Sequence, residues 1–135
     1  MEADISRVLI PRETIARRVR ELAGEIASTY GDEASGLVLV PILSGSLIFT
    51  ADLMRELPFV MRIAVLSVSS YRGASTQGGT PNILQDLKLD IRGRHVLVVD
   101  DILDTGNTLR LVMGKLAERG PAILRMCVML RKTGK

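Results

Sequence analysis

Apolar residues recur along this chain in two different patterns, which largely alternate. Spacings of three and four residues are typical of amphipathic helices, and continuous apolar runs are typical of buried strands. The first pattern predicts a helix from Pro11 to a stop at Gly31, one from the 43–46 loop through Leu57, and one from Leu109 to the turn at Gly120. The second pattern predicts strands over 36–43, 61–69, 96–99 and 122–130. Strands alternating with helices predict an α/β fold.

The uninterrupted apolar runs indicate parallel strands that are covered on both faces. We therefore predict a three-layer α/β structure with a mostly parallel, twisted sheet and helices on both of its faces. Pro41 lies inside the first strand, although proline has no N–H to contribute to a sheet. The 135 residues suffice for one domain over 1–135, and its core should be aliphatic, because 47% of residues are apolar and only 3% are aromatic.

One stretch, 96–109, combines this fold pattern with candidate chemistry. It reads Val-Leu-Val-Val-Asp-Asp-Ile-Leu-Asp-Thr-Gly-Asn-Thr-Leu. Its apolar run predicts a strand that ends at two adjacent carboxylates, Asp100 and Asp101. A third carboxylate, Asp104, precedes a short turn of small polar residues, and the helical pattern then begins at Leu109.

The turn around Gly106 suits an anion. At the carboxyl end of a parallel strand, the N–H groups of a tight loop and of the next helix point to one place, which favours a phosphate. Gly106 lets the backbone approach the ligand, and Thr105, Asn107 and Thr108 add hydroxyl and amide donors. The carboxylates would repel a phosphate, but paired carboxylates accept hydrogen bonds from vicinal hydroxyls. These features together predict a sugar phosphate as the ligand.

Three other interpretations of the acidic strand end fit this sequence less well. Receiver domains also contain a strand that ends in two aspartates, but near the start of the chain, whereas here only 34 residues follow Asp101. A haloacid-dehalogenase nucleophile needs the pattern Asp-x-Asp-x-Thr, whereas residues 101–105 read Asp-Ile-Leu-Asp-Thr. Solvation of a strand end by acidic residues does not account for the longer motif.

The 96–109 stretch resembles the signature of the type I phosphoribosyltransferases. Its form Asp-Asp-Ile-Leu-Asp-Thr-Gly-Asn-Thr-Leu is most similar to that of the hypoxanthine-guanine branch. The resemblance implies that Asp100 and Asp101 hold the ribose 2′- and 3′-hydroxyls and that Asp104 exchanges a proton with N7 of the purine. It also implies that Thr105 to Thr108 hold the 5′-phosphate. The likeness extends from the first predicted helix to the last predicted strand.

Two further segments resemble parts of the same family. The loop residues Leu43, Ser44 and Gly45 resemble the pyrophosphate loop, although many relatives have a basic residue where this chain has Ser44. Ser70 and Tyr71, with the Gly-, Ser- and Thr-rich loop that follows, resemble the lid that closes over the active site. By composition alone, these segments suit a second anion site and a polar loop that has little to bury.

The reaction that the resemblance implies is transfer of phosphoribose from 5-phosphoribosyl-1-pyrophosphate to a 6-oxopurine, hypoxanthine or guanine. This reaction serves purine salvage and yields a nucleoside 5′-monophosphate and pyrophosphate. The resemblance also implies Mg²⁺ as cofactor, with Asp100 and Asp101 as candidate ligands, and a homodimer or homotetramer. Two alternatives stay open: a regulator that binds the sugar pyrophosphate or a nucleotide without catalysis, and a phosphoribosyltransferase for another base, such as a pyrimidine.

Charge and cysteine content narrow the expected partners. The net charge of +3 fits a polyanionic ligand, but no basic run with interleaved aromatic residues indicates nucleic-acid binding. The single cysteine, Cys127, cannot form an internal disulfide, and we find no signal peptide and no apolar run that could span a membrane. We therefore expect a cytoplasmic protein that binds neither nucleic acid nor a membrane.

Relatives in this family continue into a hood segment, which supplies an aromatic residue that stacks on the purine, a lysine for its 6-oxo group and an aspartate for magnesium. No counterpart precedes Lys135. The sequence leaves two explanations open, a hood absent from this chain or a naturally reduced form. Either predicts a chain that binds the sugar phosphate but turns over purines slowly.

Overall fold

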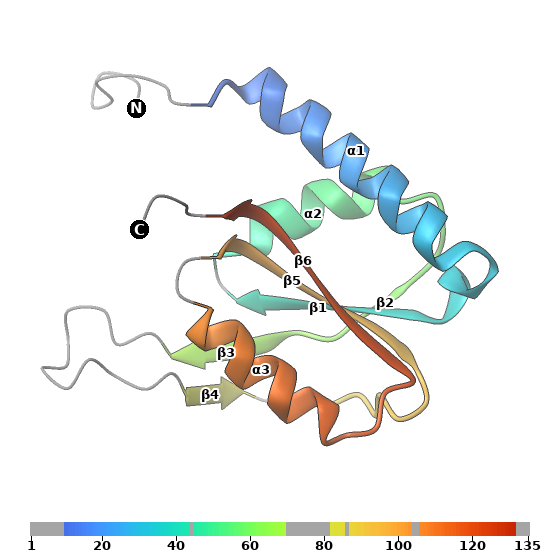
Figure 1. The fold of residues 1–135 in the computed structure, drawn as a ribbon, viewed down its shortest axis with the longest axis vertical. Helices are drawn as coiled ribbons and strands as arrows, with labels where there is room; N and C mark the ends of the chain where they lie inside the picture. The colour runs from blue at the N-terminus through green and yellow to red at the C-terminus, as the bar shows by residue number, and fades with distance from the viewer. Residues whose placement is uncertain (1–9, 44, 70–81, 86, 104–105, 132–135) are drawn as a thin grey trace, which may run out of the picture.

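The computed structural model describes residues 10–43, 45–69, 82–85, 87–103 and 106–131 (Figure 1). Its helices are α1 (Arg12–Tyr30), α2 (Leu47–Glu56) and α3 (Asn107–Ala117), and a 3-10 segment, η2 (Gly31–Gly36), follows α1. Its strands are β1 (Leu37–Leu43), β2 (Arg62–Ile63), β3 (Leu66–Ser69), β4 (Asn82–Gln85), β5 (His95–Leu103) and β6 (Ile123–Arg131).

The strands form one sheet around β1. The sheet has the order β4-β3-β1-β5-β6, and the short β2 pairs with the beginning of β1. All of these pairs are parallel except that of β3 with β4. Helices α1 and α2 cover one face of the sheet and α3 covers the other (Figure 1). The predicted three-layer α/β fold with a mostly parallel sheet is therefore confirmed.

The core lies on both faces of the two central strands, β1 and β5. Because successive side chains of a strand point to opposite faces, Leu39 and Leu97 pack beneath α1 and α2, whereas Val38 and Val98 pack beneath α3. These side chains are all buried. Burial on both sides explains why the apolar runs in the sequence are uninterrupted.

The predicted strand 61–69 is in fact two strands, β2 and β3, and Pro41 lies opposite the break between them. β1 pairs with β2 as far as Leu39–Ile63 and with β3 from Ile42–Leu66. The Leu39 carbonyl accepts a hydrogen bond from the Ala64 N–H at 3.0 Å, so the backbone polar groups of Leu39 face β2, and those of residue 41, two positions later, face the same side. Proline has no N–H. An N–H at residue 41 would point at the break between β2 and β3, where neither strand has a residue that pairs with residue 41.

Strand β5 is longer than the predicted strand 96–99. It stays paired with the nine-residue β6 as far as Leu103–Arg131. Asp100 and Asp101 therefore lie within the last part of a strand, and the prediction that the strand ends at them is wrong. The antiparallel β4 is another difference, because the apolar pattern does not predict a strand over 82–85.

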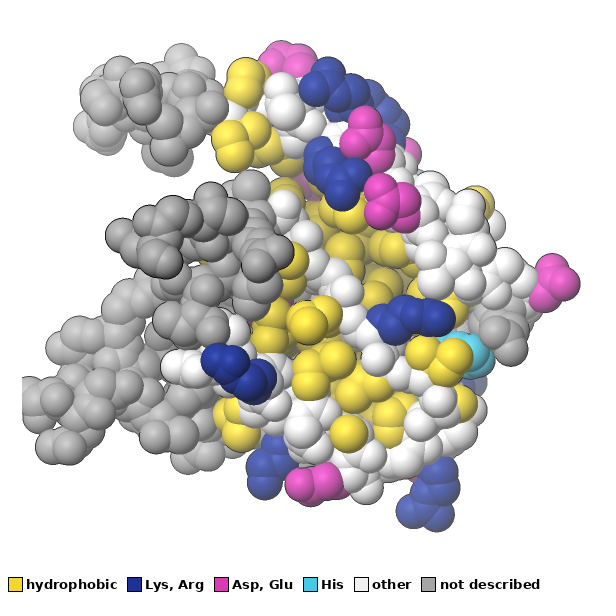
Figure 2. Space-filling model, in the orientation of Figure 1, with side chains coloured by type: hydrophobic (Ala, Val, Ile, Leu, Met, Phe, Trp, Pro, Cys, Tyr) yellow, Lys and Arg dark blue, Asp and Glu magenta, His cyan; other side chains and the backbone are white. Residues whose placement is uncertain are grey.

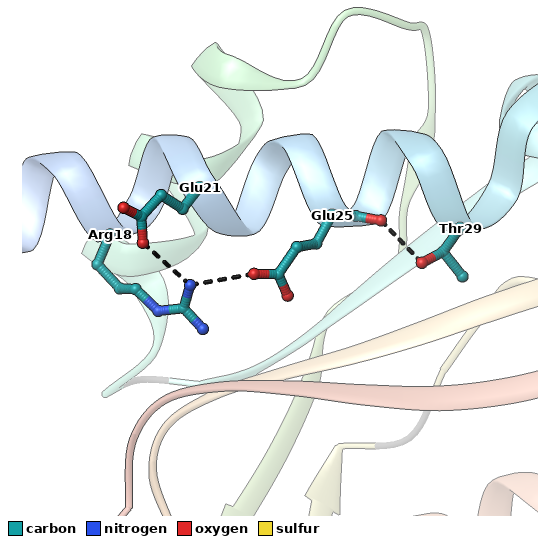
Figure 3. A network of polar contacts seen from close by, with 4 residues as sticks. All are labelled: Arg18, Glu21, Glu25 and Thr29. Atoms are coloured by element: carbon teal, nitrogen blue, oxygen red, sulfur yellow. Dashed lines mark hydrogen bonds and ion pairs between the residues drawn. The ribbon is translucent and has the colours of Figure 1, made fainter.

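On α1 the Arg18 guanidinium contacts Glu21 and Glu25 at 3.2 and 3.1 Å, and Thr29 donates to the Glu25 carbonyl (Figure 3). Figure 2 shows basic and acidic side chains gathered over α1, and apolar side chains below them over the strands. The exposed ion pairs of Arg18 with Glu21 and Glu25 contribute little to stability. Within the residues described, no helix is both long and apolar enough to cross a membrane.

Cys127 of β6 is buried and forms no disulfide. Burial raises the pKa of its thiol to about 11, so the side chain is a neutral thiol at physiological pH. This agrees with the prediction that Cys127 packs as a small apolar residue.

The packing of α2 on the sheet predicts the effect of two truncations in this helix. Leu53 is fully buried, so Leu53→Ala should lower the free energy of unfolding by about 2–5 kcal/mol in urea denaturation. Ile48 lies in the same helix but is 71% exposed, so Ile48→Ala should change it by less than about 0.5 kcal/mol. Equal losses in the two variants would contradict this packing.

Candidate functional site

The candidate site lies where β1 and β5 end side by side. These strands are parallel neighbours, with Val40 opposite Val98 and Pro41 opposite Val99. β1 continues into α2 on one face of the sheet, and β5 continues into α3 on the other (Figure 1). Open α/β sheets bind ligands outside the carboxyl ends of the strands, at the position where consecutive connections leave in opposite directions.

Asp100 and Asp101 lie at this end of β5, and both are half-buried. Backbone donors hold both carboxylates. The Asp101 N–H donates to Asp100 Oδ1 at 2.9 Å, and the Ile102 N–H donates to Asp101 Oδ1 at 2.8 Å. Each carboxylate therefore has one oxygen fixed by the strand itself, and its other oxygen can accept hydrogen bonds from a ligand.

The environment of Asp100 disfavours its ionised form. Burial raises the pKa of this carboxyl from 3.8 to about 6, and the neighbouring Asp101 carboxyl adds to the rise. The backbone N–H of Asp101 acts in the opposite direction but does not compensate. A ligand that offers hydroxyl donors or a cation to the pair would therefore stabilise the ionised form.

The loop between β1 and α2 is packed directly against this acidic pair. A Cβ built on Gly45 would lie 2.8 Å from Asp101 Oδ2, closer than real contacts allow. Ser46, the next residue, is completely buried, and its Oγ donates to the Ile42 carbonyl at 2.6 Å. The Ser46 bond ties the loop to the strand it leaves, and the absence of a side chain at Gly45 lets the loop reach Asp101.

The loop between β5 and α3 ends at Gly106, which has the left-handed conformation, with φ 85° and ψ 0°. α3 begins at Asn107, two residues before the predicted start, and its first intrahelical bond runs from the Arg110 N–H to the Gly106 carbonyl at 2.8 Å. The N–H groups of the first turn, from Asn107 to Leu109, have no intrahelical acceptor, as at any helix start. They are available to an anion.

The structure brings together all of the predicted site residues that it describes. Those at the carboxyl ends of β1 and β5 and at the start of α3 are Leu43, Gly45, Asp100, Asp101, Gly106, Asn107 and Thr108. The other predicted residues, which lie outside the described part of the chain, are Ser44, Ser70, Tyr71, Asp104 and Thr105.

Sequence reasoning overlooks two residues of this site, Ser46 and Arg110. Ser46 is detectable as a serine just before a helix, although its hydroxyl bonds to Ile42 rather than capping α2. Arg110 is one helical turn after Gly106, and its Nη2 donates to Asn107 Oδ1 at 3.2 Å. The spacing of four residues from the glycine is the signal for Arg110, because helical side chains lean toward the N-terminus.

The acidic pair fits a magnesium ion. Mg²⁺ prefers oxygen ligands and is commonly held by one or two carboxylates together with waters and the phosphates of a substrate. Two adjacent carboxylates, one of which has a raised pKa because it is buried beside the other, supply such ligands. Within the described residues no group of three or more His, Cys, Asp or Glu side chains gathers, so the pair would need oxygens from a ligand or from water.

The sheet is mostly parallel, the start of α3 is open to an anion, and paired carboxylates lie beside a tight glycine loop. These features are typical of the class of α/β proteins that bind phosphorylated sugars or nucleotides. The phosphoribosyl transferase domain model matches residues 10–135, so the chain belongs to the phosphoribosyl transferase family. The predicted resemblance is confirmed.

Comparison with individual relatives indicates which branch of the family this chain is most similar to. The chain is 41% identical over 133 residues to the hypoxanthine-guanine phosphoribosyltransferase of Mycobacterium avium, and 96% of this chain matches 66% of that protein. It is 43% identical over 126 residues to the enzyme of the same name from Aquifex aeolicus, and 93% of it matches 70% of that protein. The chain thus spans about two thirds of the length of these relatives.

A solved structure from the same branch has the same fold. The hypoxanthine-guanine phosphoribosyltransferase of Bacillus anthracis superposes with a TM-score of 0.86 at 33% identity, over 96% of this chain and 76% of that one. Fold and sequence therefore point to the same branch, the hypoxanthine-guanine one that the 96–109 motif predicts.

The raised pKa of Asp100 predicts how stability depends on pH. The folded carboxyl binds its proton more tightly than the unfolded one, so its stabilising contribution is complete below pH 3.8 and is lost as pH rises through about 6. Asp100→Asn should therefore raise the free energy of unfolding at pH 8 by up to about 3 kcal/mol, with no gain below pH 4. Urea denaturation across this pH range measures the difference.

Asp32→Asn is the matched control, because Asp32 is an exposed carboxylate in η2. It should leave the pH profile of stability close to that of the wild type. A variant Asp100→Asn no more stable than the wild type at pH 8 would contradict the predicted cost of ionising Asp100.

The contact between Gly45 and Asp101 predicts a double-mutant result. Gly45→Ala should destabilise the protein by about 1–3 kcal/mol, because the new methyl group displaces a carboxylate that the Ile102 N–H holds in place. With Asp101→Gly in the background, the same change should be neutral or stabilising, since alanine restricts the unfolded chain more than glycine does. Equal effects of Gly45→Ala in both backgrounds would show that the two residues do not touch.

Proposed function

We propose that this chain carries out the reaction named for its relatives, the transfer of phosphoribose from 5-phosphoribosyl-1-pyrophosphate to hypoxanthine or guanine. The observation that carries the proposal is the contact of Gly45 with Asp101. Because of this contact, the loop after β1 lies next to the acidic pair. In the substrate, the pyrophosphate and the ribose hydroxyls are on neighbouring carbons, so the groups that bind them have to lie close together.

The order of groups along the site supports the same substrate. The start of α3 is suited to the 5′-phosphate, the acidic pair to the ribose 2′- and 3′-hydroxyls, and the loop after β1 to the pyrophosphate. In this proposal Thr105 to Thr108 bind the 5′-phosphate through backbone and hydroxyl donors. Residues Leu43 to Gly45 bind the pyrophosphate.

Catalysis would rest on the charges around the anomeric carbon. As the bond to pyrophosphate breaks, positive charge develops on the sugar ring, and the carboxylates of Asp100 and Asp101 stabilise it. Asp104 takes up or gives back the proton at N7 of the purine. Ser70 and Tyr71 begin a lid that excludes water, which would otherwise hydrolyse the activated sugar.

Magnesium is part of the same proposal. Asp100 and Asp101 would hold it, and the ion would neutralise charge on the pyrophosphate. The cytoplasmic location and the homodimer or homotetramer also stay predictions.

The test measures binding and transfer with the same preparations. The wild type should bind 5-phosphoribosyl-1-pyrophosphate in the presence of Mg²⁺ and form the nucleoside monophosphate from hypoxanthine or guanine at a low rate. Asp104→Asn should lower kcat by roughly 10²–10⁴ while leaving the affinity for the sugar pyrophosphate nearly unchanged, because its proposed role is proton transfer. Asp32→Asn should leave both quantities unchanged.

Three other outcomes would each contradict a part of the proposal. Failure of the wild type to bind the sugar pyrophosphate would exclude the function. Binding without transfer to any base would favour the non-catalytic regulator. Equal losses of affinity and kcat in Asp104→Asn would assign this residue to binding rather than to proton transfer.

A further inference from the structure

The hydrogen bonds between β1 and β5 stop just before the acidic pair. The backbone polar groups of a strand face its two neighbours in turn, and those of Leu39 face β2, so those of Ile42 face β5. The last pair of β1 with β5 is Pro41–Val99. One further step would place Ile42 opposite Asp100, and the Ile42 carbonyl would then accept the Asp101 N–H. The pairing ends before this bond.

Two side chains take the place of the bond that is not formed. Ser46 Oγ donates to the Ile42 carbonyl at 2.6 Å, and Asp100 Oδ1 accepts from the Asp101 N–H at 2.9 Å. Backbone polar groups that are shielded from water need hydrogen-bond partners. Each side chain therefore serves a backbone group that the opposite strand would otherwise serve.

Of these two side chains, that of Ser46 is the fixed one. Ser46 is completely buried, and its carbonyl accepts the Thr50 N–H at 2.8 Å in the first turn of α2. Helix α2 thus holds its backbone while its hydroxyl holds the end of β1. A ligand does not reach a completely buried hydroxyl, so Ser46 acts on the site through its neighbours. Asp100, by contrast, is half-buried and lies in the candidate site.

We propose that Ser46 is a positioning residue of the acidic pair, which occupies the Ile42 carbonyl and so leaves the Asp101 N–H to hold the carboxylate of Asp100. The strands separate at this point because the serine replaces the next bond between them. The consequence for ligand binding rests on the function proposed above, in which Asp100 and Asp101 bind the ribose hydroxyls and Mg²⁺.

A purely structural role for Ser46 predicts a different result. In that case Ser46→Ala would lower the melting temperature, but the folded variant would keep its β1–β5 pairing and its affinity. If Ser46 positions the acidic pair, the freed Ile42 carbonyl accepts the Asp101 N–H, and the carboxylate of Asp100 loses its backbone donor. Both changes occur in the folded protein and are measured there, well below the melting temperature.

NMR spectroscopy identifies the acceptor of the Asp101 N–H. A scalar coupling across a hydrogen bond joins the amide nitrogen of the donor to the carbonyl carbon of the acceptor. Without ligand, the isotope-labelled wild type should show no coupling between the Asp101 nitrogen and the Ile42 carbonyl carbon, and Ser46→Ala should show one. Thr29→Ala is the matched control, because Thr29 also donates to the carbonyl four residues before it, at 2.7 Å, but is exposed on α1. Its spectrum should match the wild type in this respect.

Calorimetry of the same proteins measures the Kd for 5-phosphoribosyl-1-pyrophosphate with Mg²⁺. We expect Ser46→Ala to raise this Kd about 10- to 100-fold, as the loss of other contacts that orient metal-binding carboxylates does. Thr29→Ala should leave it nearly unchanged. If Ser46→Ala does not fold, Ser46→Cys takes its place in both measurements, because a thiol of similar size is a weak donor.

Three results would overturn the role of Ser46: the coupling in the wild type, no coupling in the Ser46 variant, or an unchanged Kd in a variant that shows the coupling. An equal rise of Kd in Thr29→Ala would also overturn it. If the wild type does not bind the sugar pyrophosphate, the proposed function fails. The spectra are recorded without ligand, so they still test whether Ser46 determines the acceptor of the Asp101 N–H.

Discussion

The parallel pairing of β1 with β5 is the constraint on which the site depends. Because these strands run side by side in the same direction, the chain leaves them at one edge of the sheet and turns to opposite faces. One exit begins α2 and the other begins α3. The two loops can therefore approach one ligand from two sides, and only the missing side chain of Gly45 lets the first loop lie against Asp101.

The layers of the fold are predictable from the sequence because they follow from local patterns. Both the three helices and the buried runs of β1, β5 and β6 have the periodicity of the structures they form. The errors arise where pairing between strands decides the outcome. β5 continues past Val99 because β6 offers partners as far as Arg131, and the break opposite Pro41 divides one predicted strand into β2 and β3.

The same distinction applies to the site. Asp100, Asp101 and Gly106 are neighbours in the sequence, so their motif is readable there. The packing of Gly45 on Asp101 joins residues far apart in the chain, and nothing in the local pattern at either position specifies it. Burial of Asp100, and with it the raised pKa of its carboxyl, is likewise a property of the assembled sheet. Distances between elements and their consequences for charge need the fold.

The charges of the site are arranged at a cost to the free protein. Two carboxylates, Asp100 and Asp101, lie half-buried beside each other. Ionising both is unfavourable, because burial and the neighbouring carboxyl raise the pKa of Asp100. The start of α3, by contrast, carries the partial positive charge of any helix N-terminus. A ligand that brings hydroxyls or a cation to the acidic pair and a phosphate to the helix start would therefore be stabilised at both places.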